Sequence, residues 1–352
     1  MDGIHPCWSH IHQDLLKEIS KRFFSYDEYI QLGLREWSLK LPKTPNGNQI
    51  PWLLLPEETF KNHCYEDEEI HHLMQLPLAD DETLDTHALK EEHVYHMMLP
   101  DMQKQNMVIR GSGHGWLVMV SISDGSIQML NPFTNVSLDL PPISALPTIY
   151  GQLSRLAFYK AGYTRWVEFP TRDKKFEDVL FFEEKIYAVN KCGQLYEFDT
   201  KTIEEGLTGG IHETRPPPNV PVSPYTCRYL FGCDNGSLLK LVRHVGRPRK
   251  TKECEIYEFY IFELKRNGKE WSRLVNLGNH ILIIGYNSSA IISVPFLSKG
   301  NQIWYADNQM ELQSSTWHPI DQDIGIFDLD DGSFHRILSL VKFFCPPVWL
   351  LP

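Results

Sequence analysis

Histidine and cysteine pairs are the side chains of this sequence whose spacing would suit a metal ion. The pairs are His71 with His72, His93 with His96, and Cys227 with Cys233. A separation of three residues places two histidine rings on one side of a helix. Structural zinc sites need four ligands, and no further cysteine or carboxylate completes a recognisable set. We interpret the histidines as solvated polar residues and the two cysteines as buried thiols, and we expect no metal or other cofactor.

Catalytic signatures are the next kind of chemistry that a spacing would reveal. The sequence contains no G-x-S-x-G, H-E-x-x-H or G-x-x-x-x-G-K-[ST] segment. The glycine-rich run from Gly111 to Gly115 is followed by an apolar strand pattern, so no helix N-terminus is available to receive a phosphate. We predict a tight turn before a strand there. Catalytic residues can also be dispersed along a sequence without forming a motif, as in some β-propeller enzymes. An enzyme therefore remains an alternative.

One basic cluster stands out in an otherwise acidic chain with a formal net charge of −11. Its members are Arg243, Arg247, Arg249, Lys250 and Lys252. The Gly-Arg-Pro-Arg-Lys run within it is similar to an AT-hook, which lays arginines in the DNA minor groove, and also to a nuclear import signal. The acidic remainder of the chain repels phosphates. We interpret the cluster as a solvated loop between strands at 238–242 and 256–264, with import and DNA binding as alternatives.

Residues 8–40 carry apolar side chains at helical spacing and predict a helical hairpin. A Ser-x-x-Glu capping box, from Ser25 to Glu28, opens the second helix. The apolar positions are Leu15, Leu16, Ile19 and Phe23 in the first helix and Ile30, Leu34 and Trp37 in the second. A hairpin of this size cannot bury such a stripe alone, so it needs a partner or the rest of the chain.

Residues 41–105 predict a linker and an acidic connector. Prolines at 42, 45, 51 and 56 interrupt the first part, where the apolar run between Pro51 and Pro56 predicts a short strand. The acidic runs Glu66–Glu69 and Asp80–Glu82 follow. We expect a partly ordered connector with one short helix at 86–97.

Residues 106–350 have the texture of a mainly β domain. Short apolar runs predict strands at 116–122, 126–130, 179–182, 186–189, 194–198, 238–242, 256–264, 280–284, 290–294, 302–305 and 324–329. The dipeptides Asp124-Gly125, Asn235-Gly236, Asn267-Gly268 and Asp331-Gly332 favour hairpin turns. An antiparallel meander of this length must close on itself or fold into two sheets. We predict a propeller-like domain of roughly five or six blades, with a β-sandwich or open barrel as alternatives.

Composition agrees with a folded protein of the cell interior. The chain has 352 residues, of which 42% are hydrophobic and 22% charged. This number of hydrophobic residues is enough to form one large core or two modest ones. No run approaches the roughly 18 apolar residues of a membrane span, and the start lacks a secretory pattern. Seven scattered cysteines favour reduced thiols. We expect a cytoplasmic or nuclear protein.

The N-terminal residues resemble a known module. The run from Trp8 to Ile19 looks like the opening of an F-box, which docks on the Skp adaptor of cullin-based ubiquitin ligases. Asp27, Tyr29, Ile30, Leu32 and Trp37 continue the match.

The later segments resemble a large plant family in which an F-box precedes an uncharacterised, Kelch-like β domain. The supporting segments are Gly111–Leu117, Leu130–Thr134, Leu140–Pro142, Glu177–Phe182, Ile186–Asn190, Gly193–Asp199, Gly325–Gly332 and Pro347–Pro352. The resemblance implies a mainly β, propeller-like domain behind a short helical F-box hairpin.

The resemblance also implies a function. Such a chain is a non-catalytic substrate receptor: its helices dock on the adaptor, and through it on a cullin, while its β domain holds a target protein. By position, the adaptor contact or the F-box core would contain Ile11, Leu15, Leu16, Ile19, Ile30, Leu32, Leu34 and Trp37. Alternative hypotheses from other functional classes are a propeller scaffold with a decayed F-box and a propeller enzyme.

The sequence departs from the family pattern at three places. Ile11-His12 stands where an F-box usually has Leu-Pro. The chain is about two residues shorter between Tyr29 and Trp37, which would rotate the following helix face by about 200°. It is also shorter between Pro147 and Leu156, which predicts that part of one blade is missing.

Overall fold

The described part of the chain is mainly β. The computed structural model describes residues 52–55, 70–75, 94–98, 107–145 without 133 and 135, 156–169 without 161, 175–199, 201, 211–217, 220, 226–246, 255–265, 268, 270–285, 289–294, 299–306, 320–343 and 347–350. The helical hairpin predicted at 8–40 lies outside these residues.

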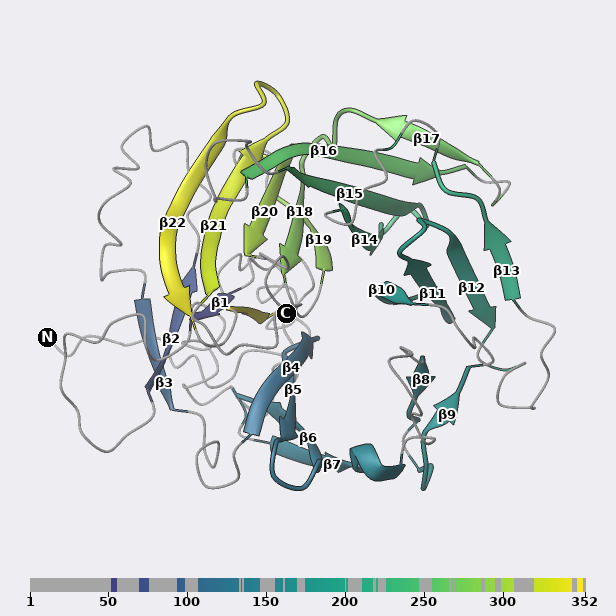
Figure 1. Cartoon of the computed structure of the whole chain (residues 1–352), viewed down its shortest axis with the longest axis vertical. Helices are drawn as coiled ribbons and strands as arrows, with labels where there is room; N and C mark the ends of the chain where they lie inside the picture. The colour runs from purple at the N-terminus through teal and green to yellow at the C-terminus, as the bar shows by residue number, and fades with distance from the viewer. Residues whose placement is uncertain are drawn as a thin grey trace, which may run out of the picture.

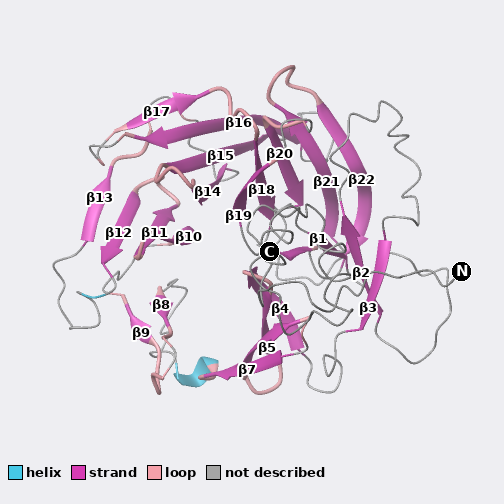
Figure 2. Ribbon diagram, turned by 180° about the vertical axis from the view of Figure 1, so that it is seen from behind, coloured by secondary structure: helices cyan, strands magenta, loops and turns pink. Residues whose placement is uncertain are grey.

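The described strands form six sheets, which Figures 1 and 2 show arranged in a ring. Sheet A contains β23 (Val348–Leu350), β1 (Trp52–Leu55), β2 (Ile70–Gln75) and β3 (Val94–Met98). Sheet B contains β4 (Met107–Gly113), β5 (Trp116–Ser121), β6 (Ile127–Asn131) and β7 (Val136–Leu140), and a 3-10 turn at Ile143–Ala145 follows it. The described part of sheet C contains β8 (Ala157–Phe158) and β9 (Val167–Glu168).

The second half of the ring holds three larger sheets. Sheet D contains β10 (Phe176–Phe182), β11 (Lys185–Asn190), β12 (Leu195–Asp199) and β13 (Ile211–Thr214). Sheet E contains β14 (Thr226–Gly232), β15 (Leu238–Gly246), β16 (Glu255–Leu264) and β17 (Trp271–Leu274). Sheet F runs in the order β19 (Ser289–Ser293), β18 (His280–Gly285), β20 (Gln302–Ala306), β21 (Ile320–Asp328) and β22 (Phe334–Phe343). The propeller-like architecture predicted from the sequence is therefore confirmed.

The hairpin turns predicted from Asn-Gly and Asp-Gly pairs are confirmed. Gly125, Gly236, Gly268 and Gly332 have φ between 66° and 80°. Each lies between two strands, where the backbone must enter the left-handed region that glycine adopts without steric strain. The glycine-rich run at 111–115 also ends in a turn, at His114 and Gly115, although its first residues belong to β4.

The connector contributes strands that the local sequence did not predict. Residues 94–98 form β3, so the short helix expected at 86–97 is wrong there. β2 pairs with both β1 and β3, and β1 also pairs with β23 near the end of the chain. These distant partners supply the backbone hydrogen bonds, and tertiary context of this kind overrides weak local preference.

Sheet F departs from a simple meander. β18 pairs with β20 in parallel, whereas β19 occupies the inner edge beside β18. The chain therefore crosses over β18 between β19 and β20, a connection that hairpin signals cannot reveal because they report only adjacent antiparallel strands.

Apolar layers between neighbouring sheets form the core. Leu54 and Val348 of sheet A pack with Leu117 of sheet B, and Leu241 of sheet E packs with Ile284 of sheet F. Further layers join sheet D to sheet E and sheet C to sheet D. Side chains of a strand alternate between its two faces, so each sheet contributes to the layer on either side.

Candidate functional site

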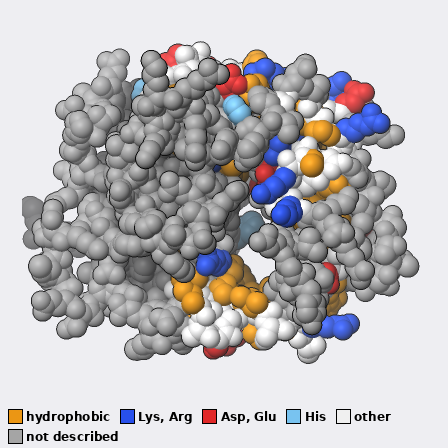
Figure 3. All heavy atoms as spheres, in the orientation of Figure 1, with side chains coloured by type: hydrophobic (Ala, Val, Ile, Leu, Met, Phe, Trp, Pro, Cys, Tyr) orange, Lys and Arg blue, Asp and Glu red, His pale blue; other side chains and the backbone are white. Residues whose placement is uncertain are grey.

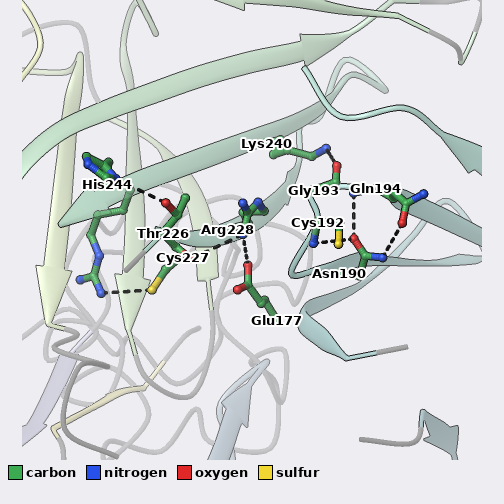
Figure 4. Close-up of polar contacts among 11 residues, drawn as sticks. Glu177, Asn190, Cys192, Gly193, Gln194, Thr226, Cys227, Arg228, Lys240 and His244 are labelled. Atoms are coloured by element: carbon green, nitrogen blue, oxygen red, sulfur yellow. Dashed lines mark hydrogen bonds and ion pairs between the residues drawn. The ribbon is translucent and has the colours of Figure 1, made fainter. Parts of the chain in front are cut away.

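A cluster of polar and charged side chains lies between sheets D and E (Figure 4). We call it the D–E polar cluster and define it as Glu177, Asn190, Gln194, Arg228 and Lys240. The charged members come from β10, β14 and β15, and the two amides flank the turn between β11 and β12. Charged groups this close to an apolar layer need compensating partners. Such groups often belong to functional sites, so the cluster is a candidate site.

Glu177 and Arg228 form the ion pair of the cluster. Arg228 Nη1 lies 2.8 Å from Glu177 Oε2, and the two side chains are 4% and 13% exposed, respectively. Burial raises the pKa of Glu177 above its usual value, although the positive charge of Arg228 acts in the opposite direction. Removing either partner would leave a buried charge uncompensated, which is why such pairs hold two elements together.

Lys240 is fully buried in β15. Its Nζ donates to the carbonyl oxygen of Gly193 at 2.9 Å and lies 3.9 Å from the ring centroid of Trp271. Burial, followed by the nearby charge of Arg228, lowers the pKa of Lys240 well below its usual value. The carbonyl and the aromatic face are the groups that stabilise the ammonium form there.

The turn from Asn190 to Gln194 aims that carbonyl at Lys240. Asn190 Oδ1 accepts hydrogen bonds from the backbone N–H of Cys192 at 3.0 Å and of Gln194 at 2.9 Å. A Cβ on Gly193 would lie 3.2 Å from Arg228 Nε, so only glycine fits without a shift. The turn thereby fixes the cluster and leaves Lys191 and Cys192 exposed.

Asp178 links three sheets through one carboxylate. Its Oδ2 accepts hydrogen bonds from the backbone N–H of Leu230 at 2.7 Å and from Ser289 Oγ at 2.9 Å. These residues belong to β10, β14 and β19, the inner strands of sheets D, E and F. Burial is the largest influence on Asp178 and raises its pKa to about 6, against the lowering effect of these hydrogen bonds.

Arg243 is the only member of the predicted basic cluster among the described residues, and it is 1% exposed. It lies within β15, which extends to Gly246 and is therefore longer than the strand predicted at 238–242. Its Nη2 donates to Cys227 Sγ at 3.7 Å, and its guanidinium lies 5.9 Å from the Tyr229 ring centroid. Arg243 is thus a core residue rather than part of an exposed loop. Arg247, Arg249, Lys250 and Lys252 lie outside the described residues.

The other predicted site residues are placed as follows. The predicted adaptor-contact residues between Ile11 and Trp37 lie outside the described residues. Cys227 and Cys233 are half-buried, and burial raises the pKa of Cys233 to about 11, so its thiol stays protonated at neutral pH. Within the described ranges, no group of three or more metal-ligating side chains comes together. Among those residues, no helix has the length and apolarity that a membrane crossing requires.

Each charged group of the D–E polar cluster has a polar partner. The Glu177 carboxylate contacts the Arg228 guanidinium, and the Lys240 amine donates to the Gly193 carbonyl. Nearby, His244 Nδ1 lies 3.4 Å from Thr226 Oγ1. Such contacts hold sheets D and E in position relative to each other. Arg228 and Lys240 are functional-site candidates that the sequence did not predict. The available signal was a lysine inside the apolar run 238–242, which marks a charge with a buried partner.

Comparison with known proteins identifies the ring of sheets. Residues 86–328 match the family model of the KIB1-4 beta-propeller. The chain belongs to the KIB1-4 beta-propeller family. The match includes sheets B to E completely and the strands β18 to β21 of sheet F.

One curated relative and two solved structures are also similar. The "Putative F-box protein" of Arabidopsis thaliana is 19% identical over 212 residues, which cover 58% of this chain and 55% of the relative. The chain thus spans about half the length of that relative. The Cps50 (Swd1) beta-propeller domain of Myceliophteria thermophila has 9% identity and a TM-score of 0.33, with 82% of this chain and 86% of that chain covered. PorZ of Porphyromonas gingivalis has 12% identity and a TM-score of 0.27, with 74% and 41% covered.

Proposed function

We propose that this chain is the substrate-recognition subunit of a Skp-cullin-F-box ubiquitin ligase. Residues 8–40 dock the Skp adaptor, and the propeller holds a target protein while other subunits transfer ubiquitin. The observation that carries the proposal is the order of two parts: an F-box-like sequence precedes a propeller of the KIB1-4 family. Similarity to a relative named as a putative F-box protein also supports the proposal.

The apolar stripe of the N-terminal segment supports docking on a partner. Leu15, Leu16 and Ile19 share one face if the segment is helical, and a short amphipathic hairpin gains most of its stability by laying that face in a groove. The Skp adaptor is the partner that the F-box resemblance implies, and a cullin joins through it.

The propeller suits a binding role without chemistry of its own. Glu177 and Asp178 of sheet D bind Arg228 and Leu230 of sheet E, so the turns and edges of these sheets lie on a fixed frame. In this proposal no residue of the chain is catalytic and no cofactor takes part. The protein acts in the cytoplasm, the nucleus or both, and nucleic acid and membrane are not partners.

An adaptor capture experiment tests the proposal. Immobilised Skp adaptor is mixed with the full chain and with the Leu15→Asp/Leu16→Asp double variant, and a Lys17→Ala variant controls for a change on the polar side of the same segment. The wild type and Lys17→Ala should bind, and the double variant should lose most of its binding while its β-sheet circular dichroism is unchanged. If the wild type fails to bind a functional adaptor, the ligase role is wrong and a propeller scaffold becomes the better interpretation.

A further inference from the structure

Basic side chains gather at one end of sheet D, around the turn between β11 and β12. Lys191 belongs to this turn, and its backbone N–H donates at 3.1 Å to the carbonyl oxygen of Lys175, which immediately precedes β10. Both lysines are exposed. Figure 3 shows Lys and Arg side chains beside a hollow in this face of the ring, where Figure 1 places β10 and β14. The whole chain has a net charge of −11, so this positive surface runs against the overall balance.

Arg228 adds a nearly buried guanidinium to the same place. Its side chain is 4% exposed, and its Nη1 donates to Glu177 Oε2 and to the carbonyl oxygen of Thr226. Among the described residues, Nε and Nη2 have no hydrogen-bond partner, and neither is a fully buried donor left without one, so both keep contact with solvent. Two available donors on one guanidinium suit the bidentate binding of an oxyanion.

The turn between β11 and β12 brings Lys191 to the open edge of Arg228. A Cβ on Gly193 would lie 3.2 Å from Arg228 Nε, so this edge of the guanidinium faces the turn, as Figure 4 shows. The positive charge of Lys191 lowers the pKa of Glu177, in opposition to burial, which means that the ammonium group lies near the Glu177 carboxylate. Lys191 and Arg228 therefore act on the same small region.

An irregularity in β10 explains how Arg228 is held there. The register between β10 and β11 shifts by one residue at Glu177. Consecutive side chains of a regular strand point to opposite faces, whereas Glu177 and Asp178 both contact β14. Bulges redirect side chains in this way and are frequent next to functional sites. Glu177 thus fixes one end of the guanidinium and leaves the other end available.

The charges of this region fit a phosphate group. Lys175, Lys191 and Arg228 are positive and Glu177 is negative, so two positive charges are in excess. Lys240 does not add to them, because it is fully buried and its Nζ binds a backbone carbonyl. A phosphorylated side chain has a charge of about −1.5 to −2 at pH 7 and three acceptor oxygens. A carboxylate has one charge and two oxygens, so it would leave part of the excess unbalanced.

We propose that Arg228, Lys175 and Lys191 form an anion-binding site, which takes the phosphate of a phosphorylated serine or threonine in the target protein. Nε and Nη2 of Arg228 donate to two of the phosphate oxygens, and the two ammonium groups balance the remaining charge. This inference rests on the proposed function, since it names the chemistry of the target that the propeller holds. The experiment that tests it does not involve the adaptor.

The probe is a fluorescein-labelled pool of short peptides with phosphoserine at the centre and random flanking residues, so no particular target sequence is assumed. Fluorescence anisotropy is measured with the full chain at about pH 7.5, where the phosphate is mostly a dianion. Matched pools have serine or glutamate at the centre. The phosphoserine pool should bind at least about tenfold more tightly than the serine pool, because charge-assisted hydrogen bonds are the strong ones.

Two exposed lysines allow the site to be changed without touching the core. Lys175→Gln and Lys191→Gln should each weaken binding of the phosphoserine pool about tenfold, and Lys191→Arg should restore it. Lys201→Gln is the matched control. Lys201 is also an exposed lysine of sheet D, but it pairs with Glu184 at the opposite end of β11. Its affinity for the pool should equal that of the wild type.

Three results would overturn the proposal. The phosphoserine pool binds no better than the serine or glutamate pool, or Lys201→Gln weakens binding as much as Lys191→Gln does. The third is tighter binding of a labelled single-stranded RNA than of the phosphoserine pool, which would assign the surface to a nucleic-acid partner.

Adaptor capture on the same variants separates this inference from the proposed function. If the wild type and Lys191→Gln capture the Skp adaptor but the phosphoserine pool does not bind, the anion site is wrong and the ligase role stands. If the pool binds as expected while no variant captures the adaptor, the ligase role is wrong and the phosphate site stands.

Discussion

Trp349 Nε1 donates a hydrogen bond to the carbonyl oxygen of Ile284 at 2.9 Å and thereby joins sheet A to sheet F. Trp349 is fully buried, and its strand β23 pairs with β1 near the opposite end of the described chain. Its own carbonyl oxygen accepts a hydrogen bond from Ser112 Oγ of sheet B. One residue near the C-terminus therefore links three sheets and closes the ring.

Replacing Trp349 should weaken this closure in two separable steps. Trp349→Phe keeps most of the apolar contact but leaves the carbonyl of Ile284 without its donor, and should lower the free energy of unfolding by about 1–3 kcal/mol. Trp349→Ala also removes the packing and should lower it by about 3–5 kcal/mol. Urea unfolding would check both values, followed by the circular dichroism of the backbone rather than by tryptophan fluorescence. A Trp349→Phe variant as stable as the wild type would contradict a role for the indole N–H, and equal losses for the two variants would contradict a separate contribution from packing.

Asp178 should make the stability depend on pH in the direction opposite to an ordinary paired carboxylate. Its pKa in the folded protein is about 6, above the usual 3.8, so the folded state binds the proton more tightly. This contribution is fully present below about pH 4 and is lost as the pH rises through 6. It amounts to at most about 3 kcal/mol, and less where water screens the carboxylate.

The Asp178→Asn variant tests this pH dependence. Asparagine keeps an oxygen acceptor for the backbone N–H of Leu230 and does not titrate. Urea unfolding of the wild type and the variant is compared between pH 4.5 and 7.5 (roughly the window that the shifted pKa defines). The wild type should lose stability relative to the variant as the pH rises. Parallel curves would show that Asp178 titrates with an ordinary pKa.

The pair Glu177–Arg228 should behave as a coupled unit. Glu177→Gln or Arg228→Met alone leaves a partner charge in a buried position and should reduce the free energy of unfolding by about 3 kcal/mol. The double variant removes both charges and should cost clearly less than the sum of the two single changes. A double-mutant cycle by chemical denaturation measures the coupling, and additive single effects would mean that the 2.8 Å contact contributes little.

Gly232 should not tolerate a side chain. A Cβ at this position would overlap the ring of Phe182, which packs between sheets D and E. Gly232→Ala should lower the free energy of unfolding by about 1–3 kcal/mol, the range typical of overpacked cores. Adding Phe182→Leu should restore part of the loss by making room, and thermal melting followed by circular dichroism measures both. A fully stable Gly232→Ala variant would show that the ring moves aside freely.

The sequence alone determined the strands whose signals are local. The runs at 186–189 and 280–284 predict β11 and β18 because their apolar residues suit a buried strand, and the Asn235-Gly236 turn follows from the backbone freedom of glycine. The F-box-like pattern at 8–40 also comes from the sequence alone, and its role in docking stays a prediction. These features depend on residues that are neighbours in the sequence, so the local sequence pattern is sufficient to predict them.

Only the tertiary structure decided which distant segments meet. β2 and β3 form because β1 and β23 provide a sheet for them, and the parallel pair β18–β20 depends on β19 taking the inner edge. The sequence likewise did not reveal that Lys240 and Arg243 are buried, because a charge is tolerated in a core only when particular partners surround it. Such partners come from other sheets, and their arrangement depends on how the whole ring packs.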